Sequence, residues 1–399
     1  MKIIHTSDWH LGNRLYNYDR TDEEEDLFRQ LAGVVAAEQP DALVVSGDIF
    51  DTGVPGNDVA KRFTERLLDV LAKCPEMETV VIAGNHDSYS RLVVDEALWR
   101  RFRVHVFGRP AEDDEGKAVF EDNVVELPGK GVIAAVPFCH PRNFPFVEGA
   151  AGENREKDYF AGLAQYVAER SKGLPSVLMA HLAVKGDIDL RGHDKTLVIG
   201  GEECVDAAEL GSAYDYVALG HIHSPQWLRG ERKVARYCGA PRVLRFDEAY
   251  EHGVDVVAVE EGRDPEVRTE VFRPLHALVT LGGDGGTAFD DALRLVSAAA
   301  EPADTYIRLN VRLGAGELPK PDWTELARNA CRVKGFRFCV NNPIRAEEPE
   351  LRAEKKNLTM DELKELSNDE VMQILSSRQR LTERQCELIK SLMGEEARA

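Results

Sequence analysis

Residues 42–48, ALVVSGD, are a short apolar run that ends in a glycine and a carboxylate. Residues 2–8, KIIHTSD, and 79–85, TVVIAGN, share this design, because each apolar run is followed by a side chain that can bind a metal ion. Short runs that are rich in β-branched residues predict buried strands. Three further strands are predicted from GVIAAVP, SVLMAH and YVALGH, at 131–137, 176–181 and 216–221.

The segments between the first three predicted strands favour helices. In 21–39, Leu27, Leu31 and Val35 recur at helical spacing behind an acidic first turn, which suits the helix dipole. Residues 58–73 repeat the amphipathic pattern. Strands that alternate with helices predict an α/β fold, a layered sheet sandwich with helices on the outside. Because the polar motifs follow the strands, we expect the site at the strand ends, where open α/β sheets hold ligands.

The composition limits the class of protein. A chain of 399 residues is too long for one ordinary core, so a large catalytic domain with smaller additions is expected. The seven cysteines are scattered and never spaced as CxxC, which predicts reduced thiols rather than disulfides or a zinc knuckle. No run of about 18 apolar residues occurs, and no signal peptide is evident, so no membrane span and a cytoplasmic location are expected.

The net charge of −20 opposes binding to a polyanion at long range. If the substrate is DNA, local basic patches, metal ions or a partner protein must supply the attraction.

Five short motifs hold the side chains that point to a chemistry. They are D8-x-H10, G47-D48, G84-N85-H86-D87, A180-H181 and G220-H221-x-H223. Residues two apart on an extended segment project to the same side, so Asp8 with His10, and His221 with His223, can each hold one ion. Asp48 is the natural bridge between ions about 3.5–4 Å apart, and Asn85 offers an amide oxygen.

This mixture of carboxylate, amide and imidazole donors favours manganese, then iron, then zinc. Two such ions lower the pKa of a bound water and stabilise charge on phosphoryl oxygens, which suits phosphoester hydrolysis. His86 is not needed for coordination, so it is predicted to protonate the leaving alkoxide or to stabilise the transition state. Asp87 could orient the His86 ring.

Each motif has a plain structural alternative. A single Gly-Asp after a strand, or a single histidine such as His181, is structural in most proteins. The ordered occurrence of all five motifs at strand ends is what favours a two-metal site. His5 lies within an apolar run and is predicted to be a core residue, and His193 lies in a polar loop where a solvated role is favoured over a substrate contact. The remaining histidines, His105, His140, His252 and His276, are interpreted as surface or packing residues.

Two smaller parts follow the catalytic segment. Between 272 and 343, FRPLHALVTL and DTYIRLNVRL predict strands on either side of a helical AFDDALRLVSAAAE, hence a small α/β cap. Residues 345–357 are rich in charge and predict an exposed linker, and 358–393 predict two or more short amphipathic helices. These helices could form a docking element or a hairpin packed on its own domain.

The blocks around the motifs resemble a known family. HTSDWHLGNRL, SGDIFDTGVP, AGNHDS, MAHLAVKG, ALGHIHSPQ and YCGAPRVLRFDE, within residues 1 to about 250, are similar to calcineurin-like metallophosphoesterases, and more narrowly to the SbcD-type nuclease subunit of bacterial SbcCD complexes. The resemblance implies a Mn²⁺-dependent nuclease of DNA repair, recombination and replication. It implies exonuclease action on double strands and endonuclease action on single strands or hairpins.

The resemblance also implies a ligand set and partners. One ion would be held by Asp8, His10, Asp48 and His223, the other by Asp48, Asn85, His181 and His221, with His86 catalytic. By analogy, residues 1–270 would be the nuclease domain, 271–345 a DNA-contacting cap, and 346–399 a linker and helices that bind an ABC-type coiled-coil ATPase (SbcC-like), in a heterotetramer containing a homodimer of this subunit. Asp51 stands where some relatives have a histidine, and Arg245 is either a phosphate contact or a surface charge.

Two other functions stay open. The same ion pair would serve a phosphatase or phosphodiesterase that acts on a small nucleotide or a phosphoprotein, although such an enzyme needs no helical docking segment. A non-catalytic scaffold of the same fold is the third possibility. The presence of all seven expected ligands and of His86 argues against it.

Overall fold

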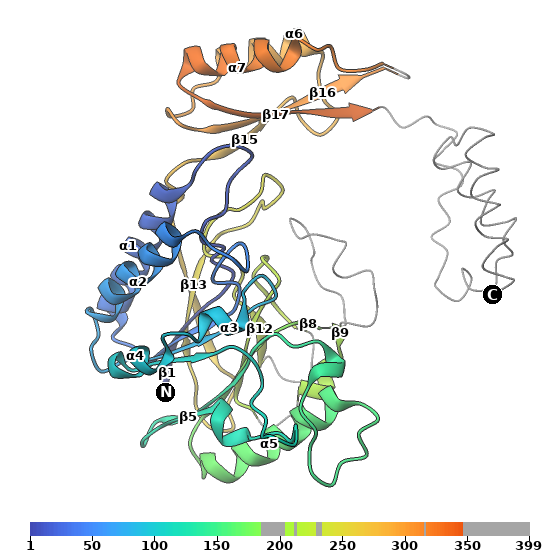
Figure 1. Cartoon of the computed structure of the whole chain (residues 1–399). Helices are drawn as coiled ribbons and strands as arrows, with labels where there is room; N and C mark the ends of the chain where they lie inside the picture. The colour runs from blue at the N-terminus through green and yellow to red at the C-terminus, as the bar shows by residue number, and fades with distance from the viewer. Residues whose placement is uncertain (185–203, 211–213, 229–233, 315–316, 346–399) are drawn as a thin grey trace, which may run out of the picture. The chain divides into compact units, whose positions relative to one another are not determined.

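The computed structural model describes residues 1–184, 204–210, 214–228, 234–314 and 317–345 (Figure 1). The predicted linker, the C-terminal helices and His193 lie outside these described residues. Residues 1–312 and 318–344 form one compact unit, so the boundary near residue 270 stays a prediction.

Two six-stranded sheets form the body of the protein. The first has the order β14-β13-β1-β2-β3-β4, in which β1 to β4 are parallel and β13 and β14 continue antiparallel. Its strands are β1 (Lys2–Thr6), β2 (Ala42–Ser46), β3 (Glu78–Ile82), β4 (Val104–Phe107), β13 (Gly253–Ala258) and β14 (Glu266–Val271).

The second sheet has the order β11-β12-β10-β7-β6-β5, with β6, β7, β10 and β12 parallel. Its strands are β5 (Val124–Leu127), β6 (Gly131–Val136), β7 (Ser176–His181), β10 (Tyr216–Gly220), β11 (Gln226–Trp227) and β12 (Ala235–Tyr237). A separate short pair is formed by β8 (Ala183–Val184) and β9 (Cys204–Val205). All six strands predicted from the apolar runs are therefore confirmed.

The two sheets pack face to face around a buried cluster that includes Ile3 and Val44 from the first sheet and Ile133 and Val177 from the second. Side chains alternate along a strand, so Ile4 points to the opposite face and joins the core beneath the helices. The result is a layered α/β sandwich, as the sequence predicts.

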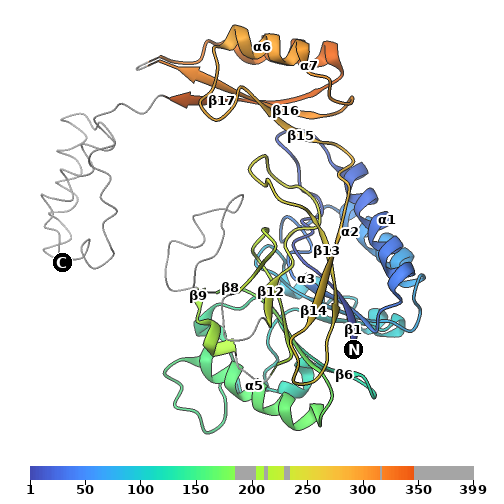
Figure 2. The ribbon, with the colours of Figure 1, turned by 180° about the vertical axis from the view of Figure 1, so that it is seen from behind.

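Helices cover the outer faces of both sheets (Figures 1 and 2). α1 (Thr21–Glu38) and α2 (Asn57–Leu71) pack on the first sheet, and α5 (Arg155–Ser171) packs on the second. α1 has three acidic residues in its first turn and buries Leu27, Leu31 and Val35, which confirms its predicted face. The short helices α3 (Tyr89–Leu92) and α4 (Glu96–Trp99) follow the third strand.

A three-stranded sheet lies C-terminal to these two sheets. It has the order β15-β16-β17, with β15 (Leu278–Leu281), β16 (Tyr306–Leu313) and β17 (Arg337–Arg345), together with α6 (Phe289–Ala298) and α7 (Trp323–Lys334). The rings of Phe289 and Trp323 stack at 4.4 Å and join the two helices. The strand expected from residue 272 begins only at Leu278, because Phe272 packs into the first core and Pro274 has no amide to donate.

Five cysteines whose side chains the structure describes are free thiols. Cys74, Cys238 and Cys331 are buried free thiols, and Cys139 and Cys339 are half-buried ones. Within the same part of the chain, no helix has the length and apolar character that crossing a membrane requires.

Candidate metal centre

The candidate site lies at the ends of strands from both sheets. Asp8, His10, Asp48 and His221 all have positive φ, between 46° and 101°, just after β1, β2 and β10. This backbone conformation costs a residue other than glycine about 1–3 kcal/mol and clusters at functional sites. All four residues belong to the predicted ligand set.

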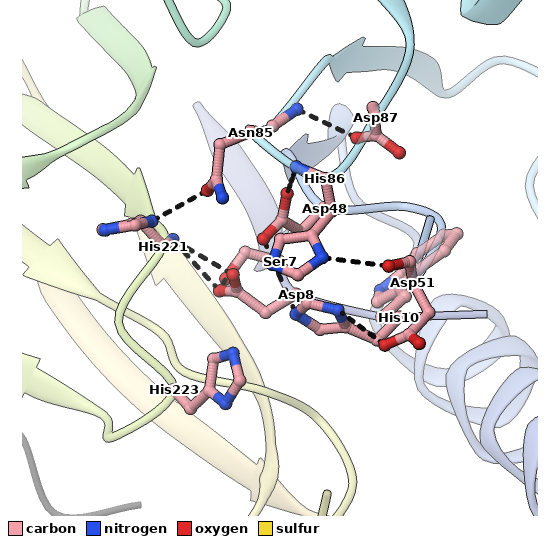
Figure 3. A network of polar contacts seen from close by, with 12 residues as sticks. Ser7, Asp8, His10, Asp48, Asp51, Asn85, His86, Asp87, His221 and His223 are labelled. Atoms are coloured by element: carbon pink, nitrogen blue, oxygen red, sulfur yellow. Dashed lines mark hydrogen bonds and ion pairs between the residues drawn. The ribbon is translucent and has the colours of Figure 1, made fainter. Parts of the chain in front are cut away.

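The structure brings all seven predicted ligands together. Figure 3 labels six of them, all except His181. Three groups of residues have donor atoms that lie within 4.8 Å of one another inside each group. The groups are Asp8, His10 and His223; His10, Asp48 and His86; and Asp8, Asp48 and His181. Asn85 completes the set, because its Oδ1 lies 3.0 Å from both His181 Nε2 and His221 Nδ1.

Asp48 occupies the centre of this cluster. Its Oδ2 lies 3.6 Å from His10 Nε2 and 3.5 Å from His181 Nε2, and the residue is only 2% exposed. One buried carboxylate between two imidazoles is the arrangement expected of a bridging ligand.

Partners on the outer side of the rings set which nitrogen faces the centre. The backbone carbonyl of Ser46 accepts a hydrogen bond of 2.8 Å from His181 Nδ1, so in the neutral ring the lone pair of His181 is on Nε2. Glu248 Oε1 lies 3.1 Å from His223 Nδ1 and plays the same part there. Sequence reasoning missed Glu248, whose only signal was its place in the block RFDE near the end of the resemblance.

His86 is oriented through its backbone and its ring. Its amide donates to Asp48 Oδ1 at 2.9 Å, and its Nδ1 donates to the backbone carbonyl of Asp51 at 2.9 Å. The ring centroid lies 4.8 Å from that of His10. His86 Nε2 is therefore the nitrogen left to exchange a proton beside the cluster.

Asp87 has a different role from the one expected. Its carboxylate accepts hydrogen bonds from the backbone amides of Gly84, Ile49 and Phe50, at 2.9 to 3.0 Å, and the His86 ring is held by Asp51 instead. The three backbone amides that Asp87 accepts from belong to the chain around β2 and β3, so its carboxylate is not available to the His86 ring. Asp87 thus ties the loop after β3 to the loop after β2.

The charges of the cluster are strongly coupled. Burial alone would lower the pKa of His181, but the Asp48 carboxylate raises it to about 9. Burial opposes ionisation of Asp48, yet His181, His10 and His86 hold its pKa well below the usual range. Burial, and then the charge of Asp48, raise the pKa of Asp87 to about 6.

The donors fit divalent cations. Buried polar atoms normally have a hydrogen-bond partner, yet His10 Nε2 has none among the described residues. That nitrogen points at the Asp48 carboxylate, within a set of carboxylate, amide and imidazole donors. A cation would satisfy it and would balance the two buried acids, Asp8 and Asp48.

Four of the other histidines follow the sequence interpretation. His5 is fully buried in β1, and His252 is buried with Nδ1 bonded to the carbonyl of Ala240. His105 pairs with Glu78, and His276 pairs with Asp22. Arg245 is exposed on the surface.

The chain is similar to known proteins over the segment that carries the site. The family model described as calcineurin-like phosphoesterase matches residues 1–225. The SbcD subunit of the nuclease SbcCD from Rhodobacter capsulatus is 32% identical over 279 residues, covering 66% of this chain and 68% of the relative. The proteins of the same name from Bacillus subtilis and Escherichia coli strain K12 are 31% and 30% identical, over 66% and 71% of this chain and 68% and 71% of theirs.

The matched segment contains every candidate ligand, from Asp8 to His223, and the relatives extend the similarity beyond it. The chain therefore belongs to the calcineurin-like phosphoesterases, a family of metal-dependent hydrolases, and within that family to the group of the SbcD nucleases.

Proposed function

We propose that this protein is the Mn²⁺-dependent nuclease subunit of an ATPase–nuclease complex, with exonuclease action on double-stranded DNA and endonuclease action on single strands and hairpins. The observation that carries the proposal is the position of Asp48 between His10 and His181, inside a converging set of phosphoesterase-type donors. The names of its relatives support DNA as the substrate. DNA repair and recombination would be its setting, in the cytoplasm with the DNA it cleaves.

The two ions would be held by two overlapping sets of side chains. The first set is Asp8, His10, Asp48 and His223, and the second is Asp48, Asn85, His181 and His221. When bound, the ions supply an activated water and electrostatic stabilisation of the phosphoryl oxygens. The mixed set of carboxylate, amide and imidazole donors, which contains no thiolate, supports manganese.

The protein's own groups supply orientation and a proton. The Asp51 carbonyl keeps the proton of His86 on Nδ1, so Nε2 can carry a second proton and deliver it to the leaving alkoxide. Ser46 and Glu248 hold a proton on Nδ1 of His181 and His223, so Nε2 of each ring is the nitrogen that would bind an ion after releasing its own proton.

The acidic chain needs help to bind DNA. We propose that an ABC-type coiled-coil ATPase supplies part of that affinity, and that the subunit works as a homodimer within a heterotetramer. The expected DNA-contacting role of 271–345 and the ATPase-binding role of 346–399 belong to this proposal. The net charge of −20 supports it, because few phosphate contacts can come from the chain itself.

The test compares an end-labelled hairpin and duplex with a chromogenic phosphodiester. After chelation, both activities should be lost, and Mn²⁺ should restore DNA cleavage better than Mg²⁺ or Zn²⁺. The His86→Ala variant should bind Mn²⁺ but not cleave DNA. Hydrolysis of the small diester without DNA cleavage, with or without the ATPase, would favour a small-molecule phosphodiesterase; inactivity on all substrates would favour the scaffold.

A further inference from the structure

A pocket of about 550 Å³ opens beside the candidate metal centre, on the side of Asn85. Gly84 and Asn85, which follow β3, form its boundary with the ligand cluster. Across from them stands Phe138, just after β6, whose amide donates to the carbonyl of Ala83 and whose ring lies 6.4 Å from the ring of His181. The pocket and the metal centre are therefore adjoining spaces that share Asn85.

Three arginines from three different segments line this pocket: Arg109, Arg142 and Arg155. Arg109 forms an ion pair of 3.4 Å with Glu112, which also lines the pocket. Among the residues that the structure describes, no carboxylate forms an ion pair with Arg142 or Arg155. In a chain with a net charge of −20, two such cations next to a phosphoester site are a local basic patch of the kind that DNA binding requires.

Arg155 is held in place and is not simply an exposed, mobile side chain. Its guanidinium lies 3.6 Å from the centroid of the Phe146 ring, and its Nη1 donates to the backbone carbonyl of Arg142 at 3.2 Å. The second contact ties α5 to the loop that carries Arg142. The Arg155 guanidinium is thus held beside the backbone that carries Arg142, which places the two arginines next to each other at the pocket.

Aromatic rings complete the lining. Tyr89, at the start of α3, is 55% exposed, and the Arg109 guanidinium lies 5.9 Å from its centroid. Together with Phe138 it offers ring faces beside the arginines. Aromatic faces combined with cations bind single-stranded nucleic acid, because only an unpaired base exposes its own face for stacking.

We propose that this pocket holds an unpaired nucleotide of the DNA strand next to the scissile phosphate, with its base against Tyr89 and Phe138 and its flanking phosphates at Arg142 and Arg155. The inference rests on the proposed nuclease function and deepens it. Asn85 lies at the boundary of the two spaces, so a strand that fills the pocket continues directly onto the metal centre. A base that is paired within a duplex cannot enter the pocket. The pocket therefore favours DNA with unpaired bases, such as frayed ends, single strands and hairpin tips.

The first experiment measures binding of a fluorescent oligothymidine by anisotropy in EDTA, so that no cleavage occurs. The Arg142→Ala/Arg155→Ala variant should bind about tenfold more weakly than wild type, and the slope of log Kd against log salt should fall by roughly 1.4, because two single-strand phosphate contacts are lost. The matched control is Arg29→Ala/Arg263→Ala, which removes two exposed arginines elsewhere on the same body. Its affinity should stay within about twofold of wild type.

The second experiment separates the ring from its hydroxyl. Tyr89→Ala should weaken oligothymidine binding by about tenfold with an unchanged salt slope, whereas Tyr89→Phe should bind like wild type. With Mn²⁺ present, both the arginine variant and Tyr89→Ala should raise KM for the single strand and leave hydrolysis of bis(p-nitrophenyl) phosphate within about twofold of wild type.

The outcomes distinguish the two proposals. If wild type hydrolyses the small diester but neither binds nor cleaves DNA, the nuclease function fails and the inference falls with it. If wild type cleaves DNA and the arginine variant matches its control in affinity and salt slope, only the inference is overturned. An equal loss of affinity for blunt duplex, or loss of small-diester hydrolysis, would also overturn it.

Discussion

The backbone amide of His86 donates a hydrogen bond of 2.9 Å to Oδ1 of Asp48, while the other oxygen of that carboxylate faces His10 and His181. One acid therefore positions the proposed proton donor and joins the two candidate ion sites. A small displacement of Asp48 would disturb both at once.

Replacing Asp48 with asparagine should remove the bridging charge while keeping the shape of the side chain. We expect Mn²⁺ binding to drop below one ion per chain and the rate of diester hydrolysis to fall by about 10³-fold or more. Two bound metal ions together stabilise the transition state by several kcal/mol. Isothermal titration and steady-state rates measure the two effects. Asp69→Asn, on the exposed surface of α2, is the matched control and should change neither.

His86→Gln should lower kcat by about 10²–10⁴-fold with little change in Mn²⁺ affinity, because glutamine cannot transfer a proton from a ring nitrogen. The measurement is kcat for a phosphodiester with a poor leaving group, such as DNA, beside one with a good leaving group. The defect should be smaller with the good leaving group, which needs no proton. Equal defects on the two substrates would contradict the role of His86 as the acid.

Glu248→Gln tests the control of His223 from outside the ligand set. Glu248 accepts a hydrogen bond from the amide of Leu244, and its carboxylate also lies against His223 Nδ1. Burial lowers the pKa of His223, but the hydrogen bond to Glu248 and the charge of Glu248 help to raise it above its usual value. Without that charge, Mn²⁺ affinity should fall by about 10–100-fold. A competition titration against a chelator measures it, with the exposed Glu251→Gln as control. Unchanged affinity would show that Glu248 has no part in positioning the ligand.

His5 should make the stability of the fold depend on pH. Its Nδ1 lies 2.8 Å from the Tyr216 hydroxyl, and burial, followed by the Arg236 charge, lowers its pKa to about 3. The unfolded chain takes up a proton near pH 6.5 while the native state does not, so stability is complete above that pH and declines below it by about 1.4 kcal/mol per pH unit.

The measurement is urea unfolding of wild type and His5→Gln, both without metal, at pH 7.5 and pH 5. Wild type should lose about 2 kcal/mol more than the variant between these two pH values. Equal losses would mean that His5 is already protonated in the native state or hydrated in both states.

The layered α/β body could be predicted from the sequence because the patterns that indicate its strands and helices are local. A run such as Ala42–Ser46 is short, apolar and β-branched, and the alternation of buried faces in β1 follows from the strand repeat alone. The strand expected from Phe272 begins later, at Leu278, for one local and one non-local reason. Pro274 is visible in the sequence, whereas the packing of Phe272 into the core of the first sheet is a tertiary contact.

The candidate ligands were also within reach of the sequence, because metal-binding residue types stand directly after predicted strands and in a recognisable order. The role of Asp87 was not. Which of two adjacent side chains, His86 or Asp87, faces the centre depends on the path of the loop after β3, and that path is set by contacts with Ile49 and Phe50 in another loop.

Local patterns along the chain thus establish the fold class and the chemical identity of the donors, since strand periodicity and the position of polar residues after strands are properties of neighbouring residues. Packing in three dimensions sets which ring nitrogens face inward, through Ser46, Asp51 and Glu248, and which side chains line the pocket beside Asn85. The pocket is lined by residues as distant in the sequence as Tyr89 and Arg155. The packing of the two sheets against each other brings these residues together, and that packing leaves no local pattern along the chain.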